Sequence, residues 1–410
     1  MSVLTSPHDS TPFRRARRAA GLALSDIVQI SEESARLKAQ GRDIVALSTG
    51  EPDFPTPAHA IEAAHEAARS GLTKYPPTAG LKSLRAAIAA RAPGPEVGPE
   101  SVLVSTGAKQ VLAMAMLATL DPGEEVILPA PCWSSYGDIV TMAGGRAVFV
   151  PCPVEAGFKL APHALAAAIT SRTRWLLLNS PSNPSGATYG AGALAALAEV
   201  LRAHPRVWVL SDEIYEHLSY VPFVSLREVA PDLAGRMLVV NGVSKAYAMT
   251  GWRIGWGIGP AALIDAMEAV QGQITSGACA IAQAAALAAL EGDQEILGQR
   301  RAVMRARRDR VVAALNATGL IDCPVPEGAF YVFPSCMRIL GLRTPQGEVL
   351  EDDRAFCRSL LQDHGVAVVP GSAFGLPGHF RLSFAYSNET LSAGLERIAK
   401  AVSSLQGTAR

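Results

Sequence analysis

The middle of the chain alternates short runs of apolar residues with longer stretches of helical periodicity. The apolar runs are continuous, as in strands that are covered on both faces of a sheet. Two of the helical stretches are KQVLAMAMLATL at 109–120 and GAGALAALAEVLRAHP at 190–205. Regular alternation of strand and helix predicts an α/β domain with a mostly parallel sheet. The predicted strands are 101–105, 125–129, 146–151, 174–179, 207–212 and 237–241.

The pattern changes near residue 293. A long, charged helical stretch covers 293–319 and is followed by short strand-like runs and two more helices. Such a mixture predicts a second, smaller α+β domain. We expect residues 55–295 to form a large domain, and segments 1–54 and 296–410 to form the small one. The elements predicted for the small domain are a helix at 25–40, strands at 328–334, 366–370 and 380–385, and helices at 351–363 and 388–405.

Composition and charge give no sign of a nucleic-acid, membrane or metal-binding protein. Hydrophobic residues make up 49% of the 410 residues, charged residues make up 18%, and the formal net charge is zero. This balance suits a globular chain and gives no indication of nucleic-acid binding, so we interpret the basic cluster at 13–20 as a solvated tail or amphipathic helix. No apolar run reaches the roughly 18 residues of a membrane span, and no export signal is visible. Because the six cysteines form no CxxC pair, we expect reduced thiols in a cytoplasmic protein that binds no metal, nucleic acid or membrane.

Ligands of α/β sheets bind at the carboxyl ends of the strands, so the polar residues there are candidates for a site. STGAK at 105–109 lies between a strand and a helix and has the outline of a phosphate cradle, although such a turn needs small residues in any case. Trp133 follows another strand, where its ring either stacks on a flat ligand or fills the core. Asn183 precedes Pro184, which holds its backbone extended; its amide could bind a ligand oxygen, although a plain turn is equally consistent.

Three charged residues follow or interrupt apolar runs. Asp212 ends a predicted buried strand, where its carboxylate needs a cation or a protonated ring as partner; the neighbouring residues lack the spacing of a metal-ligand set. Arg381 has apolar neighbours and needs an anion, either in a structural ion pair or as the carboxylate of a ligand. Lys245 is one of only seven lysines, and Arg253 follows eight residues later in VVNGVSKAYAMTGWRIG (239–255). A lysine directly after an apolar strand is a candidate reactive centre.

These motifs, taken in order, resemble the class I aminotransferases of the fold-type I pyridoxal-phosphate enzymes. The lysine motif of that family is close to Ser-Lys-x-Phe/Tyr-x-Met-Thr-Gly-Trp-Arg-Ile-Gly, and this chain has SKAYAMTGWRIG at 244–255. The resemblance covers about residues 25–405 and is strongest to bacterial aspartate aminotransferases with a Gly-Gly/Ala-Lys-Gln loop. The other matching motifs are STGEPDFPTP (48–57), KYPPTAGLKSLR (74–85), STGAKQ (105–110), PCWSSY (131–136), NSPSNPSG (179–186), SDEIY (211–215), PEGAFYVF (326–333) and RLSFA (381–385).

The resemblance implies that the large domain binds pyridoxal 5'-phosphate. Lys245 would form the Schiff base with the cofactor's aldehyde. Asp212 would pair with the protonated pyridine nitrogen and keep the ring cationic. Tyr215 and Asn183 would bind the phenolic oxygen of the ring, and Trp133 would stack on it. The implied catalytic residues are Lys245, Asp212 and Tyr215.

The resemblance also implies a site for the cofactor's phosphate and a second subunit. Arg253 would bind the phosphate, together with Ala108 and Lys109 at a helix N-terminus and with Ser244. Tyr75 matches a tyrosine that reaches the phosphate of the cofactor in the other subunit. We therefore expect a homodimer with shared active sites.

The implied substrates are an amino acid and a 2-oxo acid. Arg381 would bind the α-carboxylate with two hydrogen bonds, assisted by Asn183 and the backbone at Gly50. Trp133 would also contact the substrate. Lys109 would bind the distal carboxylate of a dicarboxylic substrate. The expected reaction is transfer of the amino group of aspartate to 2-oxoglutarate, giving oxaloacetate and glutamate by a ping-pong mechanism. An aminotransferase for aromatic or other amino acids and a β-lyase on the same scaffold remain alternatives.

The chain departs from the family pattern at Gly242 and in the segment 261–285, among other places. Some members have a phosphate-binding serine three residues before the lysine, where this chain has Gly242, and Ser244 is the candidate replacement. The segment 261–285 contains no arginine or lysine, so it lacks the arginine that binds dicarboxylates from the partner subunit in another branch. Lys109 is the natural substitute, and an arginine of the tail at 14–18 is the weaker candidate.

Overall fold

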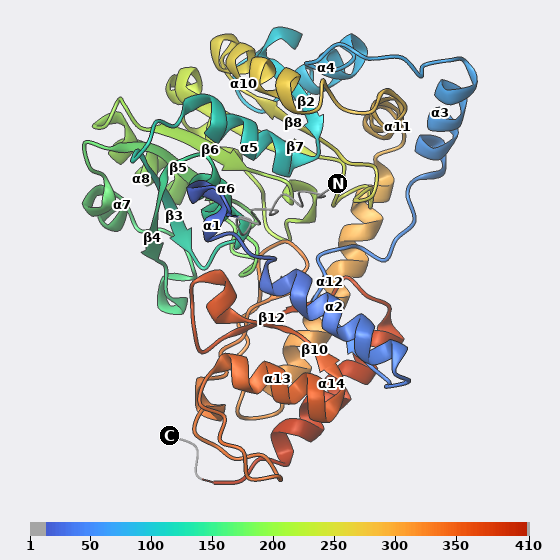
Figure 1. Ribbon diagram of the computed structural model, residues 1–410, viewed down its shortest axis with the longest axis vertical. Helices are drawn as coiled ribbons and strands as arrows, with labels where there is room; N and C mark the ends of the chain where they lie inside the picture. Colours follow the sequence, from blue (N-terminus) through green and yellow to red (C-terminus); the bar gives the residue numbers. More distant parts are fainter. Residues whose placement is uncertain (1–13, 408–410) are drawn as a thin grey trace, which may run out of the picture.

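A seven-stranded sheet forms the centre of the larger part of the chain (Figure 1). The computed structural model describes residues 14–407 and gives the strand order β2-β8-β7-β6-β5-β3-β4. All neighbouring pairs are parallel except those of β8, which runs antiparallel to both β2 and β7. The strands are β2 (Val102–Thr106), β3 (Glu125–Ala130), β4 (Arg146–Pro151), β5 (Thr173–Asn179), β6 (Trp208–Asp212), β7 (Met237–Gly242) and β8 (Ile254–Ile258).

The six strands predicted in this region are confirmed to within one residue at each end. Strand β8 was not predicted, because its glycines interrupt the apolar run and glycine weakens a strand signal. The structure shows why glycine is needed there. A Cβ atom on Gly255 would lie 2.2 Å from the backbone nitrogen of Ala108, and one on Gly257 would lie 2.9 Å from the Val111 side chain. The missing side chains let the helix at Ala108 pack directly on β8.

Helices cover both faces of the sheet, and each face has its own apolar cluster (Figure 1). Successive residues of one strand point to opposite faces, so Leu103 belongs to one cluster whereas Val102 and Val104 belong to the other. The predicted helices at 109–120 and 190–205 are confirmed as α5 and α8. The helices around the sheet are α3 (Ala58–Arg69), α4 (Lys82–Ala89), α5 (Ala108–Thr119), α6 (Ser135–Met142), α7 (Pro162–Ala168), α8 (Ala191–Arg202), α9 (Leu226–Val229), α10 (Ala261–Ile274) and α11 (Ala280–Glu291).

A second core combines residues from both ends of the chain. The long helix α12 (Glu295–Asn316) leads into it and packs against α14. Strand β1 pairs with β10 in parallel, so that Val45 lies opposite Val366. The domain boundaries predicted near residues 55 and 295 stay a prediction. The remaining elements are α1 (Arg17–Ala20), α2 (Asp26–Ala39), β1 (Val45–Ala46), β9 (Tyr331–Val332), α13 (Asp353–His364), β10 (Val366–Ala367), β11 (Val369–Pro370), β12 (Phe380–Ser383) and α14 (Asn388–Ser403).

The basic cluster predicted at 13–20 is described only in part. Residue 13 and the side chains of residues 17 and 18 lie outside the described part of the chain, whereas Arg14 and Arg15 are exposed and α1 follows them. Across residues 14–407, we find no helix with both the length and the apolar character that a membrane crossing requires.

Candidate active site

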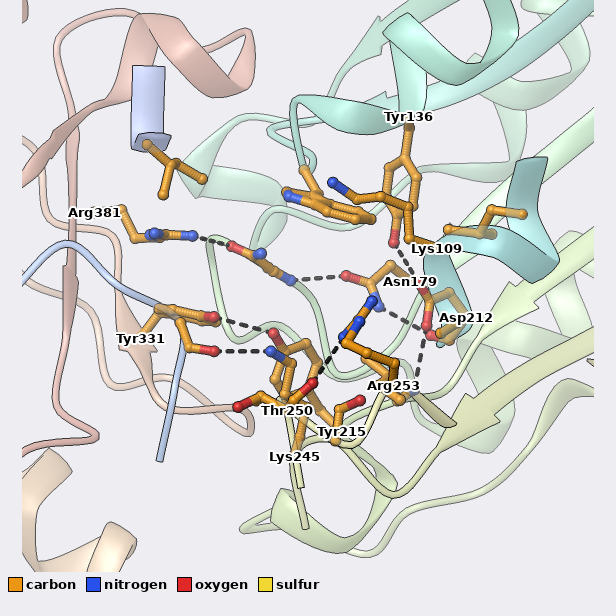
Figure 2. Close-up of a pocket in the computed structure, with 18 residues that line it drawn as sticks. Lys109, Tyr136, Asn179, Asp212, Tyr215, Lys245, Thr250, Arg253, Tyr331 and Arg381 are labelled. Atoms are coloured by element: carbon orange, nitrogen blue, oxygen red, sulfur yellow. Dashed lines mark hydrogen bonds between the residues drawn. The ribbon is translucent and has the colours of Figure 1, made fainter. Parts of the chain in front are cut away.

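A cavity of about 310 Å³ opens at the carboxyl ends of β5, β6 and β7 (Figure 2). It receives side chains from the large sheet and from the second core. Eleven of the twelve residues predicted from the sequence line it, and Tyr75 does not. Those eleven are Gly50, Ala108, Lys109, Trp133, Asn183, Asp212, Tyr215, Ser244, Lys245, Arg253 and Arg381.

Asp212 is the last residue of β6, and its carboxylate is buried. Oδ2 accepts a hydrogen bond of 2.7 Å from the Tyr136 hydroxyl, and Oδ1 accepts one of 3.3 Å from the amide of Ile214. Burial raises the pKa of Asp212 to about 6, against the effect of these bonds. The sequence predicted a cation or protonated ring as partner. That partner stays a prediction, and within the chain the carboxylate accepts from the neutral phenol of Tyr136, on α6.

Asn179 and Asn183 extend this network across the cavity, and Figure 2 shows Asn179 next to Asp212. Asn179 donates to the backbone oxygen of Asp212 at 2.9 Å and accepts from the backbone amide of Asn183 at 2.8 Å. Oδ1 of Asn183 then accepts from the Arg381 guanidinium at 2.9 Å. These bonds fix the direction of each amide, so the position of Arg381 is linked to the end of the central sheet.

Lys245 lies in the loop after β7, and its amine is enclosed by the cavity walls. The amine donates a hydrogen bond of 2.8 Å to the backbone oxygen of Gly50. Burial, together with the charges of Arg381 and Arg253, lowers the pKa of Lys245 to about 8. The lowered pKa increases the fraction of neutral amine at neutral pH, and the neutral amine is the nucleophilic form. Gly50 is required here because a Cβ atom would lie 2.2 Å from the Tyr331 hydroxyl.

Arg253 and the N-terminus of α5 form a positively charged cradle. The Arg253 backbone has a φ of 58°, and its guanidinium donates to the backbone oxygen of Thr250 at 2.9 Å. Gly107, the N-cap of α5, provides no capping side chain, and a Cβ atom there would lie 2.6 Å from the guanidinium. Uncapped helix amides beside an arginine are suited to bind a phosphate.

The glycine at position 242 has a steric cause. A Cβ atom on Gly242 would lie 2.9 Å from both the Cα atom of Gly255 and the backbone oxygen of Ile254. A serine side chain would therefore push β7 and β8 apart. Ser244 lines the cavity instead, which agrees with its expected place.

Arg381 is a buried cation on β12. Its guanidinium donates to Asn183 and to the backbone oxygen of Ser48, and its Nε has no partner. The ring centroids of Tyr331 and Phe374 lie 4.4 Å and 5.0 Å from it. No ion pair within residues 14–407 includes Arg381, so the structural alternative named above does not occur in this part of the chain. A buried guanidinium in this state calls for an anionic ligand.

Lys109 lies beside Trp133. Its amine is 4.6 Å from the ring centroid of Trp133 and donates to the Ser135 hydroxyl at 3.2 Å. Burial, followed by the charge of Arg253, lowers the pKa of Lys109. Both side chains line the cavity, and among the described residues the amine of Lys109 has no carboxylate in an ion pair.

Tyr75 lies apart from the other predicted residues. Its side chain is 93% exposed, and it lines a separate concavity of about 480 Å³ with Thr275 and Ser276. Its predicted role toward a partner subunit stays a prediction. Among the tail arginines, Arg14 and Arg15 do not line the main cavity, and Arg15 donates to the backbone oxygen of Leu22 at 3.0 Å.

Several residues of the cavity were not selected from the sequence. Asn179 had a usable signal, because it ends a predicted strand just as Asp212 does. Tyr136 and Tyr331 lie inside quoted motifs, but a neutral phenol gives no charge-based signal, and only the folded chain shows their contacts. The residues missed are Ile27, Leu112, Tyr136, Asn179, Ile214, Thr250 and Tyr331.

Comparison with known proteins identifies the family. The model for the family "Aminotransferase class I and II" matches residues 42–398. The chain belongs to this aminotransferase family. The predicted relationship is thereby confirmed, and the protein is an aminotransferase enzyme.

Relatives of this aminotransferase resemble it over nearly their whole length. The aspartate aminotransferase of Rhizobium meliloti (strain 1021) is 50% identical over 394 residues, which are 95% of this chain and 96% of the relative. The aspartate/prephenate aminotransferase of Cereibacter sphaeroides (strain ATCC 17029 / ATH 2.4.9) is 48% identical, with 91% of this chain and 95% of the relative covered.

Solved structures confirm the fold class of this aminotransferase. The crystal structure of the Rhizobium meliloti aspartate aminotransferase has a TM-score of 0.94 at 49% identity, covering 96% of this chain and 100% of that one. The Thermus thermophilus aspartate aminotransferase with maleate has a TM-score of 0.88 at 42% identity, covering 95% and 100%. The predicted α/β architecture of a fold-type I transferase is therefore correct.

Proposed function

We propose that this aminotransferase binds pyridoxal 5'-phosphate in the main cavity and transfers the amino group of aspartate to 2-oxoglutarate, giving oxaloacetate and glutamate. The observation that supports it most is the set of charged groups around one cavity without counter-ions. Within residues 14–407, no ion pair includes Asp212, Lys245, Arg253 or Arg381. The similarity to aspartate aminotransferases supports aspartate as the donor.

The side chains of the cavity fit the cofactor. When bound, pyridoxal phosphate supplies an aldehyde that reacts with amines and a ring that withdraws electrons from the substrate's α-carbon. The buried carboxylate of Asp212 would hold a protonated ring nitrogen, and the face of Trp133 would cover the ring. Tyr215 and Asn183 would bind the phenolic oxygen. The fit rests on the buried, unpaired state of Asp212 and on the empty capping position of α5.

The phosphate of the cofactor would bind at the cradle described above. Arg253 and the uncapped amides at Ala108 and Lys109 would supply the donors, together with the hydroxyl of Ser244. Arg253 has no acidic partner that would compete for its guanidinium among the described residues. Two negative charges of a phosphate would offset the excess of cations around the cavity.

Arg381 would bind the substrate, and Lys245 would move its proton. The guanidinium of Arg381 binds the α-carboxylate with two parallel hydrogen bonds, and Asn183 keeps it oriented. The amine of Lys245, once free, takes the proton from the α-carbon and returns one during the second half of the reaction. Two half-reactions that share one site give ping-pong kinetics.

One substrate panel tests the reaction. Purified enzyme is assayed with single amino acids against 2-oxoglutarate and against oxaloacetate, and we expect the highest kcat/KM for aspartate and glutamate. A clear preference for phenylalanine or tyrosine would contradict the aspartate assignment. Release of pyruvate and ammonia from a β-substituted amino acid, with no oxo-acid acceptor needed, would replace the proposal with a β-lyase.

Lys109 would select the distal carboxylate of the substrate. We expect Lys109→Ala to lower kcat/KM for aspartate about 10- to 100-fold, since a hydrogen bond to a charged group contributes about 1.5–3 kcal/mol. The values for alanine and phenylalanine, measured in the same assay, should change much less. The exposed Lys82→Ala variant is the matched control. If Lys109→Ala lowers kcat/KM for alanine as much as for aspartate, Lys109 acts on the cofactor and does not bind the substrate's side chain.

We infer further that the enzyme is a homodimer with shared active sites. Tyr75 is exposed and lines a concavity with Thr275, whose hydroxyl accepts from the side chain of Gln110 at 2.9 Å. Gln110 belongs to the first turn of α5, so this surface is next to the phosphate cradle. An exposed tyrosine here suits contact with a second copy of the chain.

Mixed dimers test this arrangement. Tyr75→Ala should weaken cofactor binding about tenfold, the loss of one hydrogen bond to a charged group. When Tyr75→Ala and Lys245→Ala chains are mixed, a hybrid contains one site with both native residues. Activity at limiting cofactor should then exceed the mean of the two variants. If the activity of the mixture equals the mean activity of the two variants, the active sites are not shared between subunits.

A cytoplasmic location is part of the proposal. All six cysteines are free thiols in the structure, which suits a reducing compartment.

A further inference from the structure

Tyr331 lies in the cavity, but the function proposed above gives it no role. It begins β9, and its side chain is 1% exposed. Its hydroxyl oxygen lies 3.1 Å from that of Tyr215, and its ring centroid lies 4.4 Å from the Arg381 guanidinium. Figure 2 shows the bond between the two hydroxyl groups. One side chain thus contacts the tyrosine assigned to the cofactor and the arginine assigned to the substrate.

The position of the Tyr331 side chain is tightly fixed. Its backbone is paired with Ser383 of β12, two residues after Arg381. The ring of Phe330 packs on it with centroids 4.7 Å apart. Gly50 leaves room for its hydroxyl, and the backbone oxygen of Gly50 holds the amine of Lys245. Because the ring is held on several sides, it can keep the residues that it contacts in fixed positions.

The direction of the bond between the two phenols follows from their proton count. Burial raises the pKa of both Tyr215 and Tyr331, so both are neutral and each has one proton to donate. If the Tyr215 hydroxyl donates its hydrogen bond to the phenolic oxygen of the cofactor, the Tyr331 hydroxyl would be the donor in the bond between the two tyrosines. A hydroxyl that accepts one hydrogen bond becomes a better donor in the next. Tyr331 would therefore strengthen the bond from Tyr215 to the cofactor.

Building on the proposed function, we propose that Tyr331 is a positioning residue that acts on the cofactor through Tyr215 and on the substrate's carboxylate through Arg381. The two actions belong to different parts of the side chain. The hydroxyl group contacts Tyr215, whereas the face of the ring attracts the buried guanidinium. Substitutions can separate them, because phenylalanine keeps the ring and leucine removes both.

The first test measures the hydroxyl group. Holoenzymes of wild type, Tyr331→Phe, Tyr215→Phe and the double variant are titrated with pH, and the pKa of the cofactor's visible absorbance band is recorded. Tyr331→Phe should raise this pKa, because the phenolate of the cofactor loses stabilisation, and Tyr215→Phe should raise it more. In the Tyr215→Phe background, Tyr331→Phe should cause no further rise in this pKa, because the hydroxyl through which Tyr331 acts is absent. An equal shift in both backgrounds, or no shift at all, would overturn the proposal.

The second test measures the ring. Tyr331→Leu should raise KM for aspartate, alanine and phenylalanine alike by about tenfold, since a desolvated cation–ring contact is lost. Tyr331→Phe should leave these KM values within about twofold, because cation–ring attraction does not need the hydroxyl. Equal KM values for the two variants would contradict the role of the ring. If Tyr331→Leu does not fold, Tyr331→Phe and the double variant still decide the proposal.

These outcomes are distinct from a failure of the proposed function. A wild type that shows no visible band with pyridoxal phosphate and no transamination would overturn both proposals. A wild type with band and activity, combined with an unshifted Tyr331→Phe, would overturn only the role of Tyr331.

Discussion

Lys245→Ala should lower transamination by about 10⁴-fold, the upper end of what a positioned general acid–base group contributes. The amine of Lys245 is placed to react with the cofactor and to move the substrate's proton. Lys109, the other lysine that lines the cavity, holds its amine at Ser135 and Trp133 instead. Gly50 fixes the amine by accepting its hydrogen bond, and burial keeps the pKa of Lys245 at about 8. Rates are measured with aspartate and 2-oxoglutarate at saturating cofactor.

A chemical readout accompanies this experiment. Borohydride treatment of the wild-type holoenzyme should leave the mass of the cofactor on the peptide that contains Lys245, and the variant should show no such adduct. Lys82→Ala, on the exposed side of α4, serves as control and should retain full activity. An undiminished visible band in Lys245→Ala would contradict the assignment of this lysine.

Asp212→Asn should lower kcat/KM by about 10²- to 4 × 10³-fold. Removing one charge of a buried pair costs about 3–5 kcal/mol, and each 1.4 kcal/mol corresponds to a factor of ten. The amide side chain keeps the shape of the carboxylate. Its single oxygen can accept from the Ile214 amide, and its NH2 group can donate to the Tyr136 hydroxyl. Without the cofactor, the variant should be at least as stable as the wild type, because a buried charge without counter-ion is removed. Thermal unfolding of the two apoenzymes measures this difference.

The neighbouring carboxyl group provides the control for Asp212. Glu213 is also buried, accepts hydrogen bonds from Ser211 and Ser225, and lies outside the cavity. Burial raises the pKa of Glu213 to about 8, so it is largely protonated at neutral pH, and Glu213→Gln should retain activity. If both variants lose activity to the same extent, the effect of Asp212→Asn reflects packing of this strand end rather than a charge on the cofactor.

The sequence predicted the sheet and the polar strand ends well, because both depend on local signals. Buried parallel strands are continuous apolar runs, so residues such as Asp212 at their ends were placed correctly in the cavity. The hydrogen bond from Tyr136 to Asp212 was not predictable, because the two residues meet only through the packing of α6 against the sheet. Tyr331 and Arg381 meet through pairing of β9 with β12, which no local pattern specifies.

Other differences have steric causes. Gly242 was identified as a departure, but its reason, the close approach of β7 and β8, needs the register of two strands. The role of Tyr75 cannot follow from one chain, because its side chain is exposed and does not line the cavity of that chain. The family resemblance supplied what local patterns did not, namely the roles of residues that are far apart in the sequence.

The pairing of β1 with β10 has a consequence for the order of folding during synthesis. Val45 is synthesised early, but it cannot pair until Val366 has also been synthesised. All seven strands of the large sheet and the helices that cover them are complete once residue 291 has emerged, so this part can fold while the rest is still being translated. The second core depends on contacts between residues that are more than 300 positions apart, which makes its closure slow. Arg381 is thus set in place near the end of biosynthesis, and a nascent or C-terminally truncated chain would hold the cofactor's half of the site without the substrate's half.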